Sequence, residues 1–551
     1  MHVTQVTING FKKFSEKSFS FNEQLNIVVG DNDSGKSTLL EAIELAVNGR
    51  YRGRSISSEV APELFNVDAI SAYLASDHSA EHLPTIKIEI YLDGCPNYRG
   101  INNTQNIDAE GITLDIAFDD DLLAAYNDFI RDNDDINTIP TEFYKVDWKD
   151  FAWNNIKYLN REAKSLLIDP SRLHPTYGKS QYIANIIDAS LDKKEKALLA
   201  VNYRQLRQSF NEQPQVREIN DRLDADNMVT EQALSIVADI SSNRNIESGL
   251  QLAVDDINFP LIGKGEQNQI QIKLALANKA ANIDFVMIEE PENHLSHINL
   301  SRLVSKIASQ HTQQLFITTH SSYVLNKLNI KNLCLIGSEY KQLKDIDSKV
   351  AKTLKRLPGY DTLRIALASK VILVEGPSDE LLLKKIYHQN HEKLPEEDGI
   401  DIIVVRGIGF KSYLEIAKHI GTQVHVVKDN DGNYQNNITD YGNDYADYDF
   451  ISFYSHIDNN LNSLEPTLID ANSSTNETLD SFAQIALSTQ TYNKYCRDCN
   501  SLAEKQEFLI SWYGGYGENF GGKKVDTAIR IFDSEEVIEY PDYLVEALNF
   551  D

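Results

Sequence analysis

The stretch Val371–Asp379 reads Val-Ile-Leu-Val-Glu-Gly-Pro-Ser-Asp and decides the fold predicted for the C-terminal part of the chain. Its first four residues are apolar, which predicts a buried strand. The Gly-Pro pair ends that strand, and the serine or aspartate after it can cap an apolar helix over Leu381–Tyr387. The turn therefore places two carboxylates, Glu375 and Asp379, near the carboxyl end of a strand, where open α/β sheets bind their ligands.

A second acidic motif follows another predicted strand. The apolar run Val424–Val427 continues into Lys428–Gly432, which reads Lys-Asp-Asn-Asp-Gly. In an extended segment the side chains of Asp429 and Asp431 would point the same way. Between the two motifs, the pattern predicts a strand over Asp401–Val405 and a helix over Tyr413–Ile420. Either motif alone is typical of a loop with a helix cap, but together they predict one site at one sheet edge.

The predicted site is rich in carboxylates. Converging carboxylates repel one another and raise their pKa values unless a cation lies between them. Hard oxygen ligands of this kind suit Mg²⁺ or Mn²⁺. Two such ions, roughly 4 Å apart, can activate a water and stabilise the leaving oxygen of a phosphodiester. The pattern therefore predicts metal-dependent phosphodiester chemistry.

The N-terminal part contains a nucleotide-binding motif. Gly30–Thr38 reads Gly-Asp-Asn-Asp-Ser-Gly-Lys-Ser-Thr and lies between an apolar strand and an apolar helix, the context that a GxxxxGK[ST] loop requires. Backbone N–H groups of such a loop cradle phosphates. Lys36 would reach the β- and γ-phosphates, and Ser37 would bind Mg²⁺. The candidate nucleotide-binding residues are Gly30, Asn32, Ser34, Gly35, Lys36, Ser37 and Thr38.

Further motifs of an ATPase lie beyond residue 256. A predicted strand ends in Glu289 and Glu290, which resembles a Walker B element, with Glu289 near the magnesium and Glu290 polarising the attacking water. Gly263 and Gly265 resemble a degenerate ABC-type signature loop, and His320 resembles the switch histidine. The order of these motifs resembles ABC-type ATPases of the SMC and Rad50 kind. In those, the signature of one head completes the nucleotide site of another.

Composition limits the class of protein. Of 551 residues, 42% are hydrophobic and 25% charged, as in a soluble globular protein with several domains. No apolar run approaches the ~18 residues of a membrane span, and the N-terminus lacks a signal-peptide pattern. The four cysteines are too few for a disulfide scaffold, and the lone C-x-x-C of Cys496 and Cys499 argues against zinc. We expect a cytoplasmic protein with no membrane partner.

The charge distribution bears on DNA binding. A net charge of −29 argues against nucleic-acid affinity over the whole surface. A DNA-acting protein of this charge needs local basic patches or bound cations. Such a patch lies in Lys341–Lys370, which holds eight Lys and Arg residues and three Asp residues. This stretch predicts either a DNA contact or a solvated linker helix.

These observations predict an α/β protein. Its first part resembles an ABC/SMC-like P-loop ATPase with an inserted helical module, and Glu-Gly at one strand end with Asp-x-Asp at another resembles a Toprim α/β domain that follows it. The Toprim fold binds metal in some topoisomerases, primases and nucleases. Helical spacing over Lys193–Arg207 and Thr230–Ile240 indicates the inserted module, a candidate dimerisation element. The expected boundaries are 1–165 and 256–340 for the ATPase, 166–255 for the helical module, 341–369 for a basic linker and 370–551 for the Toprim domain.

The chain as a whole resembles the OLD (overcoming lysogenization defect) family of nucleases. The resemblance implies metal-dependent cleavage or nicking of DNA, ATP-linked control and a homodimer or higher oligomer. It also implies a role in anti-phage defence, where some members act with a UvrD-like helicase, as in the Gabija system, and others accompany a retron. The implied cofactors are ATP and Mg²⁺ or Mn²⁺, with two ions at the Toprim site and one beside the nucleotide.

The same resemblance implies site residues. The metal ligands carried over are Glu375, Asp379, Asp429, Asp431 and Glu465, with Ser463 nearby. The family's catalytic lysine corresponds to Lys523 or Lys524, and the sequence does not choose between these neighbours.

Two other functions remain open from the sequence. The first is an SMC- or Rad50-like DNA-clamp ATPase in repair, with a Toprim domain that does not cleave. The full set of acidic residues argues against it. The second is strand passage of the topoisomerase type, which needs a tyrosine nucleophile from another domain. The chain has 26 tyrosines, but no recognisable module surrounds one.

Overall fold

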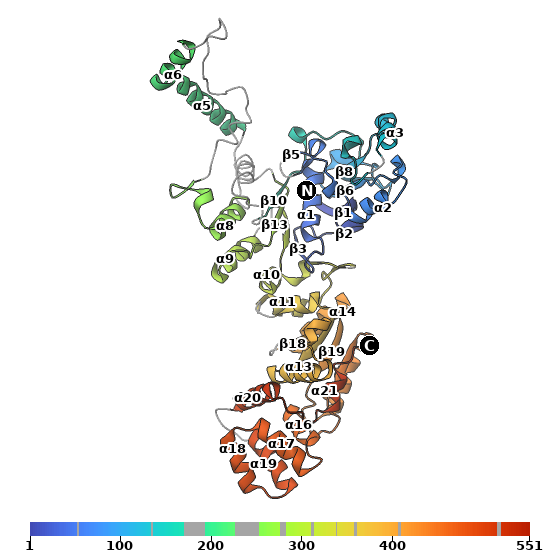
Figure 1. The fold of residues 1–551 in the computed structure, drawn as a ribbon, viewed down its shortest axis with the longest axis vertical. Helices are drawn as coiled ribbons and strands as arrows, with labels where there is room; N and C mark the ends of the chain where they lie inside the picture. The colour runs from blue at the N-terminus through green and yellow to red at the C-terminus, as the bar shows by residue number, and fades with distance from the viewer. Residues whose placement is uncertain are drawn as a thin grey trace. The chain divides into compact units, whose positions relative to one another are not determined.

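A computed structural model describes residues 1–51, 54–133, 136–169, 193–225, 253–275, 283–309, 313–337, 339–356, 361–405, 409–514 and 520–550. The chain forms two compact units (Figure 1). The N-terminal unit contains residues 1–320 and 332–340, and the C-terminal unit contains residues 321–331 and 341–551. Among the described helices, none is long and apolar enough to cross a membrane.

An antiparallel sheet forms one layer of the N-terminal unit. Its strands follow the order β2-β1-β6-β8-β7, and β9 also pairs with β8. Alternate side chains of β1, including Val6 and Ile8, are fully buried, as the period of a half-buried strand requires. The strands are β1 (His2–Phe11), β2 (Phe14–Ser20), β6 (Ile86–Asp93), β7 (Arg99–Gly100), β8 (Ala109–Phe118) and β9 (Tyr144–Asp150).

A parallel sheet forms the second layer of the unit, in the order β10-β13-β14-β3-β15. The nucleotide-binding motif follows β3, and the Glu289-Glu290 pair lies at the end of β13, so both lie toward the carboxyl edge of one sheet. The strands are β10 (Ser165–Ile168), β13 (Phe285–Glu289), β14 (Gln314–Thr318), β3 (Leu25–Val29) and β15 (Leu333–Ile336).

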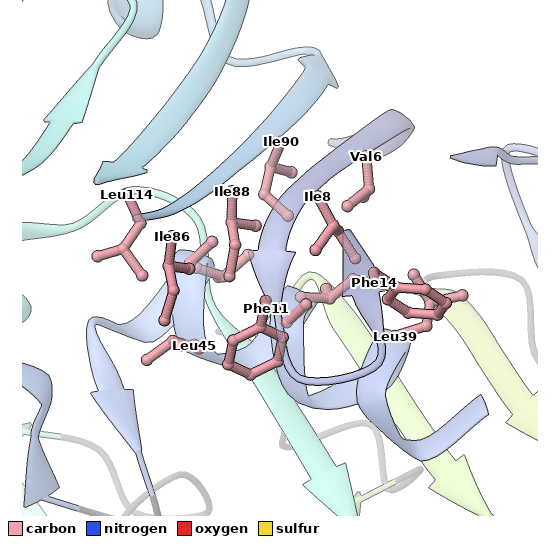
Figure 2. Close-up of a cluster of buried hydrophobic side chains, with 14 of the residues drawn as sticks. Val6, Ile8, Phe11, Phe14, Leu39, Leu45, Ile86, Ile88, Ile90 and Leu114 are labelled. Atoms are coloured by element: carbon pink, nitrogen blue, oxygen red, sulfur yellow. The ribbon is translucent and has the colours of Figure 1, made fainter. Parts of the chain in front are cut away.

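Helix α1 (Lys36–Asn48) lies between the two sheets and packs against strands of both. Figure 2 shows Leu39 and Leu45 of this helix beside side chains of β1, β6 and β8. The helix buries nearly its whole surface because both of its neighbours are sheets. This packing fixes the start of α1, where the phosphate-binding loop ends.

The expected helical module is only partly described. Helices α5 (Lys193–Asn211) and α6 (Pro214–Ala225) are present, while the predicted helix over 230–240 lies outside the described residues. The N-terminal edge set at 166 is wrong, because residues 166–168 pair with β13 inside the ATPase sheet. The other elements of this unit are α2 (Val67–Leu74), α3 (Leu123–Asp132), α8 (Lys264–Ala275), α9 (His297–Ala308), β4 (Arg50–Tyr51), β5 (Arg54–Ser55), β11 (Ala253–Val254) and β12 (Ile257–Asn258).

A four-stranded parallel sheet forms the centre of the C-terminal unit, in the order β18-β17-β19-β20. Its apolar strands and intervening helices appear in the predicted order, which confirms the predicted α/β arrangement there. The bounds are β17 (Lys370–Val374), α13 (Pro377–His391), β18 (Ile400–Val404), α14 (Phe410–Ile420), β19 (Gln423–Val427) and β20 (Ile451–Tyr454).

A group of helices completes this unit and shares a core with β17 and α13, in which Leu383, Phe482 and Leu509 are fully buried. The helices are α16 (Leu464–Ala471), α17 (Asn476–Ala486), α18 (Thr489–Asp498), α19 (Leu502–Gly514), α20 (Phe520–Asp533) and α21 (Asp542–Glu546). Lys523 and Lys524 lie inside α20.

Two stretches differ from their expected character. Residues 341–369, expected as a linker, contain α11 (Ser348–Arg356) and α12 (Thr362–Leu367), which pack in the C-terminal unit with α10 (Ser322–Lys327). Strand β16 (Tyr340–Gln342) precedes them. Residues 433–449 are rich in Asn, Asp and Tyr, a composition typical of a solvated loop, but they contain a π-helical segment over Gln435–Asp440 and the short α15 (Tyr441–Asn443). Tyr441 and Tyr445 pack on Phe453 there, so aromatic burial orders the segment.

Candidate functional site

The two acidic motifs of the C-terminal unit meet at one sheet edge. Strands β17 and β19 are parallel neighbours, with Leu373 opposite Val426. Their carboxyl ends therefore lie side by side, which brings Glu375 beside Asp429. The backbone N–H of Asp429 donates a hydrogen bond to the Glu375 carboxylate. The structure thus joins two motifs that lie more than 50 residues apart in the sequence.

Three helices bring further charged groups to this edge. Asp379 lies in the first turn of α13, where its Oδ2 accepts a hydrogen bond from the Gly376 N–H at 2.9 Å. Glu465 lies in the first turn of α16 and is only 6% exposed. The Lys524 ammonium, on α20, donates to Glu465 Oε2 at 2.6 Å. We name Glu375, Asp379, Asp429 and Glu465 the acidic cluster.

Burial and mutual repulsion dominate the electrostatics of the acidic cluster. Burial, followed by the charges of Asp379, Glu375 and Glu465, raises the pKa of Asp429 to about 8. Burial likewise raises the pKa of Asp379 to about 7, against the Gly376 hydrogen bond. Burial also raises the pKa of Glu375, while the nearby Lys428 ammonium lowers it. Positive charge added beside these carboxylates would relieve their mutual repulsion.

Other predicted residues lie differently from what the sequence suggested. Asp431 has a backbone φ of 48° and a side chain that is 65% exposed, so the extended geometry expected for Asp429 and Asp431 is wrong. Its charge still raises the pKa of Glu375. Ser463 precedes α16 and makes no capping hydrogen bond with its side chain. The side chain of Lys523 lies outside the described residues.

Two residues near the cluster were missed by the sequence analysis. Lys428 places its ammonium 3.9 Å from the Asp431 carboxylate and near Glu375. It directly precedes Asp429, so its position in the quoted motif was a signal that could have been used. Tyr543 is buried, and the charges of Asp429, Asp379 and Glu465 raise the pKa of its phenol. No local pattern links this tyrosine to a motif more than 100 residues earlier.

The donor set fits divalent metal, although it is not a closed cage. Among the residues that the structure describes, no three His, Cys, Asp or Glu side chains are already grouped to hold an ion. Mg²⁺ commonly uses one or two carboxylates and completes its shell with waters and substrate phosphates. Glu375, Asp379 and Asp429 supply such oxygens, and burial is the main cause of the raised pKa of each.

The phosphate-binding loop of the N-terminal unit has the shape that its motif requires. Gly35 begins α1 with φ 100°, and a Cβ there would lie 2.5 Å from the Phe14 ring, so only glycine fits. The Lys36 ammonium donates to the backbone oxygens of Gly30 and Asp31, both at 2.8 Å. The Ser34 hydroxyl is buried without a hydrogen-bond partner in the described structure. A phosphate fits this cradle because it would accept from both Lys36 and Ser34.

The Walker B residues lie against this loop. The Ser37 hydroxyl donates to Glu289, so two oxygen ligands suited to Mg²⁺ are adjacent. Burial lowers the pKa of Lys36, while the charges of Glu290, Asp31 and Glu289 raise it. Glu290 has a φ of 42° and accepts from Asn293 Nδ2 at 2.6 Å. An unusual backbone conformation held by a side-chain hydrogen bond is typical of a functional position.

His320 is positioned by two acidic residues. Its Nε2 lies 3.4 Å from Glu290 Oε1. Its backbone N–H and the Thr319 hydroxyl both donate to Glu292 Oε1, at 2.7 and 2.8 Å. Burial raises the pKa of Glu292, and these hydrogen bonds lower it. The end of β14 is therefore tied to the loop after β13, which sets the position of His320 beside Glu290.

The glycines of the degenerate signature lie beside the loop after β13. A Cβ at Gly265 would lie 2.2 Å from the His294 carbonyl oxygen, so this helix start approaches the loop backbone closely. Asn268 donates to the Asn293 carbonyl at 3.3 Å. A Cβ at Gly263, in contrast, meets no described atom within 4 Å. The described part of the chain therefore leaves space for a side chain at Gly263.

A P-loop ATPase joined to an acidic Toprim site defines the class of this protein, and comparisons with known proteins agree. A family model described as AAA ATPase domain matches residues 1–325, and one described as Overcoming lysogenization defect protein-like, TOPRIM domain matches residues 367–431. The chain belongs to the AAA ATPase domain family and carries an OLD-like TOPRIM domain. The fold class predicted from the sequence and the resemblance to the OLD family are both confirmed.

Individual proteins show similar likenesses. The chain is 23% identical over 474 residues to the Endonuclease GajA of Bacillus cereus (strain VD045), covering 78% of this chain and 75% of that one. It is 28% identical over 90 residues to the DNA replication and repair protein RecF of Acetivibrio thermocellus, covering 16% and 23%. A solved Smc head bound to the C-winged helix domain of ScpA covers 62% of this chain and 95% of its own, with 14% identity and a TM-score of 0.33.

Proposed function

We propose that this protein is an ATP-binding and ATP-hydrolysing, metal-dependent DNA endonuclease that acts in anti-phage defence. The observation that carries the proposal is the acidic cluster, in which Lys524 is paired with Glu465 beside carboxylates of raised pKa. Such a cluster is costly for a fold unless cations and phosphates bind there. The likeness to a protein named an endonuclease over most of both chains supports the same conclusion.

The residues divide the work at the site. Divalent metal held by Glu375, Asp379 and Asp429 would supply a Lewis acid and a water of lowered pKa. Lys524 is positioned to contact the scissile phosphate or the charge that develops on it, while Glu465 orients its ammonium. Lys428 adds a second positive charge on the side of Glu375.

The ATPase half is proposed to regulate cleavage. Phosphodiester hydrolysis runs downhill, so ATP is not needed as fuel. ATP turnover by Lys36, Ser37, Glu289, Glu290 and His320 would set the access of DNA to the acidic cluster, and the active form would be a homodimer or higher oligomer. A UvrD-like helicase or a retron component is the proposed kind of partner in the cell.

The alternative is a DNA-clamp ATPase with an inert Toprim domain. It is disfavoured because the acidic cluster retains its carboxylates and a paired lysine. Incubating supercoiled plasmid with the full chain and Mg²⁺ or Mn²⁺, with no nucleotide, ATP or ADP, separates the functions. Nicked or linear DNA free of protein supports the proposal, unchanged DNA supports the clamp, and protein-linked DNA indicates a topoisomerase. Identical cleavage rates in all three nucleotide conditions would refute regulation by ATP.

A further inference from the structure

Several cationic side chains of the C-terminal unit pair with carboxylates, among them Lys428 with Asp431 and Lys524 with Glu465. Arg364 pairs with Asp401 on β18, and its guanidinium also donates to the Ile402 carbonyl at 2.9 Å. The other ion pairs are Lys384 with Glu380 and Glu396, Lys393 with Asp398, Lys418 with Glu415, Lys505 with Asp480, and Arg497 with Asp498. The positive charges of these side chains are balanced by carboxylates of the same C-terminal unit.

Helix α11 is different. Lys349, Lys352, Lys355 and Arg356 are exposed, and within the described ranges no ion pair joins them to a carboxylate. The first two and the last follow i, i+3, i+7 spacing, which places them on one side of the helix. Two further exposed lysines, Lys344 and Lys411, flank α11. We name these six residues the basic face.

The basic face belongs to a packed helix. Helix α11 buries Val350, Ala351 and Leu354 and contacts α10, so its cations are held on a fixed surface. Asp345 and Asp347 are exposed acidic residues just before the helix, and Asp347 lies close to Lys349 and Lys411. Its carboxylate accepts from the backbone N–H groups of Lys349 and Val350, at 2.8 and 3.1 Å, and caps the helix start.

The position of Lys411 relates this face to the edge of the sheet that carries the acidic cluster. Lys411 lies in the first turn of α14, which follows β18, and β18 runs parallel to β17. Lys411 is close enough to Asp347 to help lower the pKa of that carboxyl, after the two backbone hydrogen bonds and the charge of Lys349. The N-terminal end of α11 therefore lies near the first turn of α14.

We propose that the basic face binds the phosphate backbone of duplex DNA and holds the duplex at the unit that carries the acidic cluster. This inference rests on the proposed function, because it assigns a binding surface to the same substrate. Charge complementarity supports it: in a chain with a net charge of −29, four exposed cationic side chains lie on one helix and form no ion pair in the described structure. Regularly spaced phosphates are the polyanion that such a face attracts, with release of condensed counterions.

The test measures binding of a fluorescently labelled 30-base-pair duplex by anisotropy, with Ca²⁺ in place of Mg²⁺, over a series of salt concentrations. The test variant is Lys349→Gln/Lys352→Gln/Lys355→Gln, since glutamine keeps helix propensity while removing charge. The matched control is Lys157→Gln/Lys306→Gln/Lys494→Gln, which removes the same charge at exposed lysines that do not belong to the basic face. A third variant, Lys349→Arg/Lys352→Arg/Lys355→Arg, keeps the charge.

We expect the glutamine variant of the basic face to bind at least tenfold more weakly near 0.1 M salt. The slope of log affinity against log salt should fall in magnitude by about 2.7, from ~0.9 for each lost phosphate contact. The control and the arginine variant should bind within twofold of wild type. Equal affinity and slope in the glutamine variant would overturn the proposal. A change in the oligomer mass of that variant without DNA would also overturn it, since the face would then join copies of the chain.

The two proposals fail separately. If wild type binds DNA through the basic face but cleaves none with Mg²⁺ or Mn²⁺, the nuclease function is wrong and the DNA surface stands. If wild type cleaves DNA and the glutamine variant binds and cleaves as wild type does, only the basic face is refuted. ATP turnover and melting temperature of each variant, compared with wild type, show that a binding loss does not come from misfolding.

Discussion

The Lys524 ammonium lies 2.6 Å from Glu465 Oε2. Lys524 therefore brings a positive charge to the acidic cluster. Glu465 is nearly buried, whereas Lys524 remains 41% exposed and can reach a bound phosphate. Of the two neighbouring lysines that the sequence could not separate, we propose Lys524 as the catalytic one, because its ammonium contacts a carboxylate of the acidic cluster.

Lys524→Ala should lower DNA cleavage by about 10²-fold or more, the scale of losing one preorganised electrostatic group. Lys523→Ala is the matched control and should cleave within a few-fold of wild type. Rates of plasmid nicking with Mg²⁺, measured beside ATP turnover, give both values. Strong loss in Lys523→Ala with full activity in Lys524→Ala would reverse the assignment.

The ATPase half gives a second prediction. Lys36→Ala should abolish nucleotide binding, because its ammonium is placed to meet the β- and γ-phosphates. Glu290→Gln should bind ATP but not hydrolyse it, since the amide cannot polarise the attacking water. Binding of a fluorescent ATP analogue and phosphate release are the measurements. ATP turnover in Glu290→Gln equal to wild type would contradict the Walker B assignment.

Assembly through the signature loop is a third prediction. A Cβ at Gly263 has open space within the described part of its own chain, so Gly263→Glu should fold normally. If the signature loop of one chain contacts the nucleotide bound to a second chain, the added carboxylate would lie beside the phosphates and repel them. ATP turnover should therefore fall at least tenfold while the melting temperature stays unchanged.

Light scattering completes this test. We expect at least a dimer for wild type with ATP. A monomer with full ATP turnover and full cleavage would exclude a site completed by a second chain.

The raised pKa values of the acidic cluster predict a pH-dependent stability. The pKa of Asp429 is raised from its ordinary value of 3.8 to about 8. At pH values between these two, the folded state therefore holds a proton that the unfolded state releases. Stability then falls as pH rises through that window. In EDTA, Asp429→Asn should melt above wild type at pH 8, by about 2–4 °C per kcal/mol of relieved strain, and the gain should shrink toward pH 5.

The control for this effect is Asp447→Asn, which removes an exposed carboxylate and should leave the melting temperature within 1 °C or so of wild type at both pH values. Adding Mg²⁺ at pH 8 should raise the melting temperature of wild type more than that of Asp429→Asn, because metal and proton compete for the same oxygens. An equal rise in both proteins would place the metal elsewhere.

The sequence predicted the parts of the fold that depend on local patterns. Apolar runs ending in Glu375 and Lys428 gave the strands, and their parallel pairing brought Glu375 to Asp429. The geometry of Asp431 was not predictable from alternation, because the turn at Gly432 places Asp431 in the left-handed region. Tyr543 could not be predicted either, since only tertiary packing brings it to the cluster.

The packing of residues 341–369 was also not predicted from the sequence. Its charge suggested a solvated linker, yet a stripe of Val350, Ala351 and Leu354 is enough to pack α11 into the C-terminal unit. Helical spacing of these apolar residues was visible in the sequence and would have predicted a packed helix. Charge content alone concealed it.

The most direct test of the central claim is the nicking rate of Asp429→Ala on supercoiled plasmid with Mg²⁺ or Mn²⁺, beside Glu375→Ala. Both residues follow the carboxyl ends of the neighbouring strands β17 and β19. Each change should therefore lower cleavage by about 10²-fold or more. ATP turnover should stay at the wild-type level. Cleavage by Asp429→Ala at the wild-type rate would show that the acidic cluster is not the nuclease site.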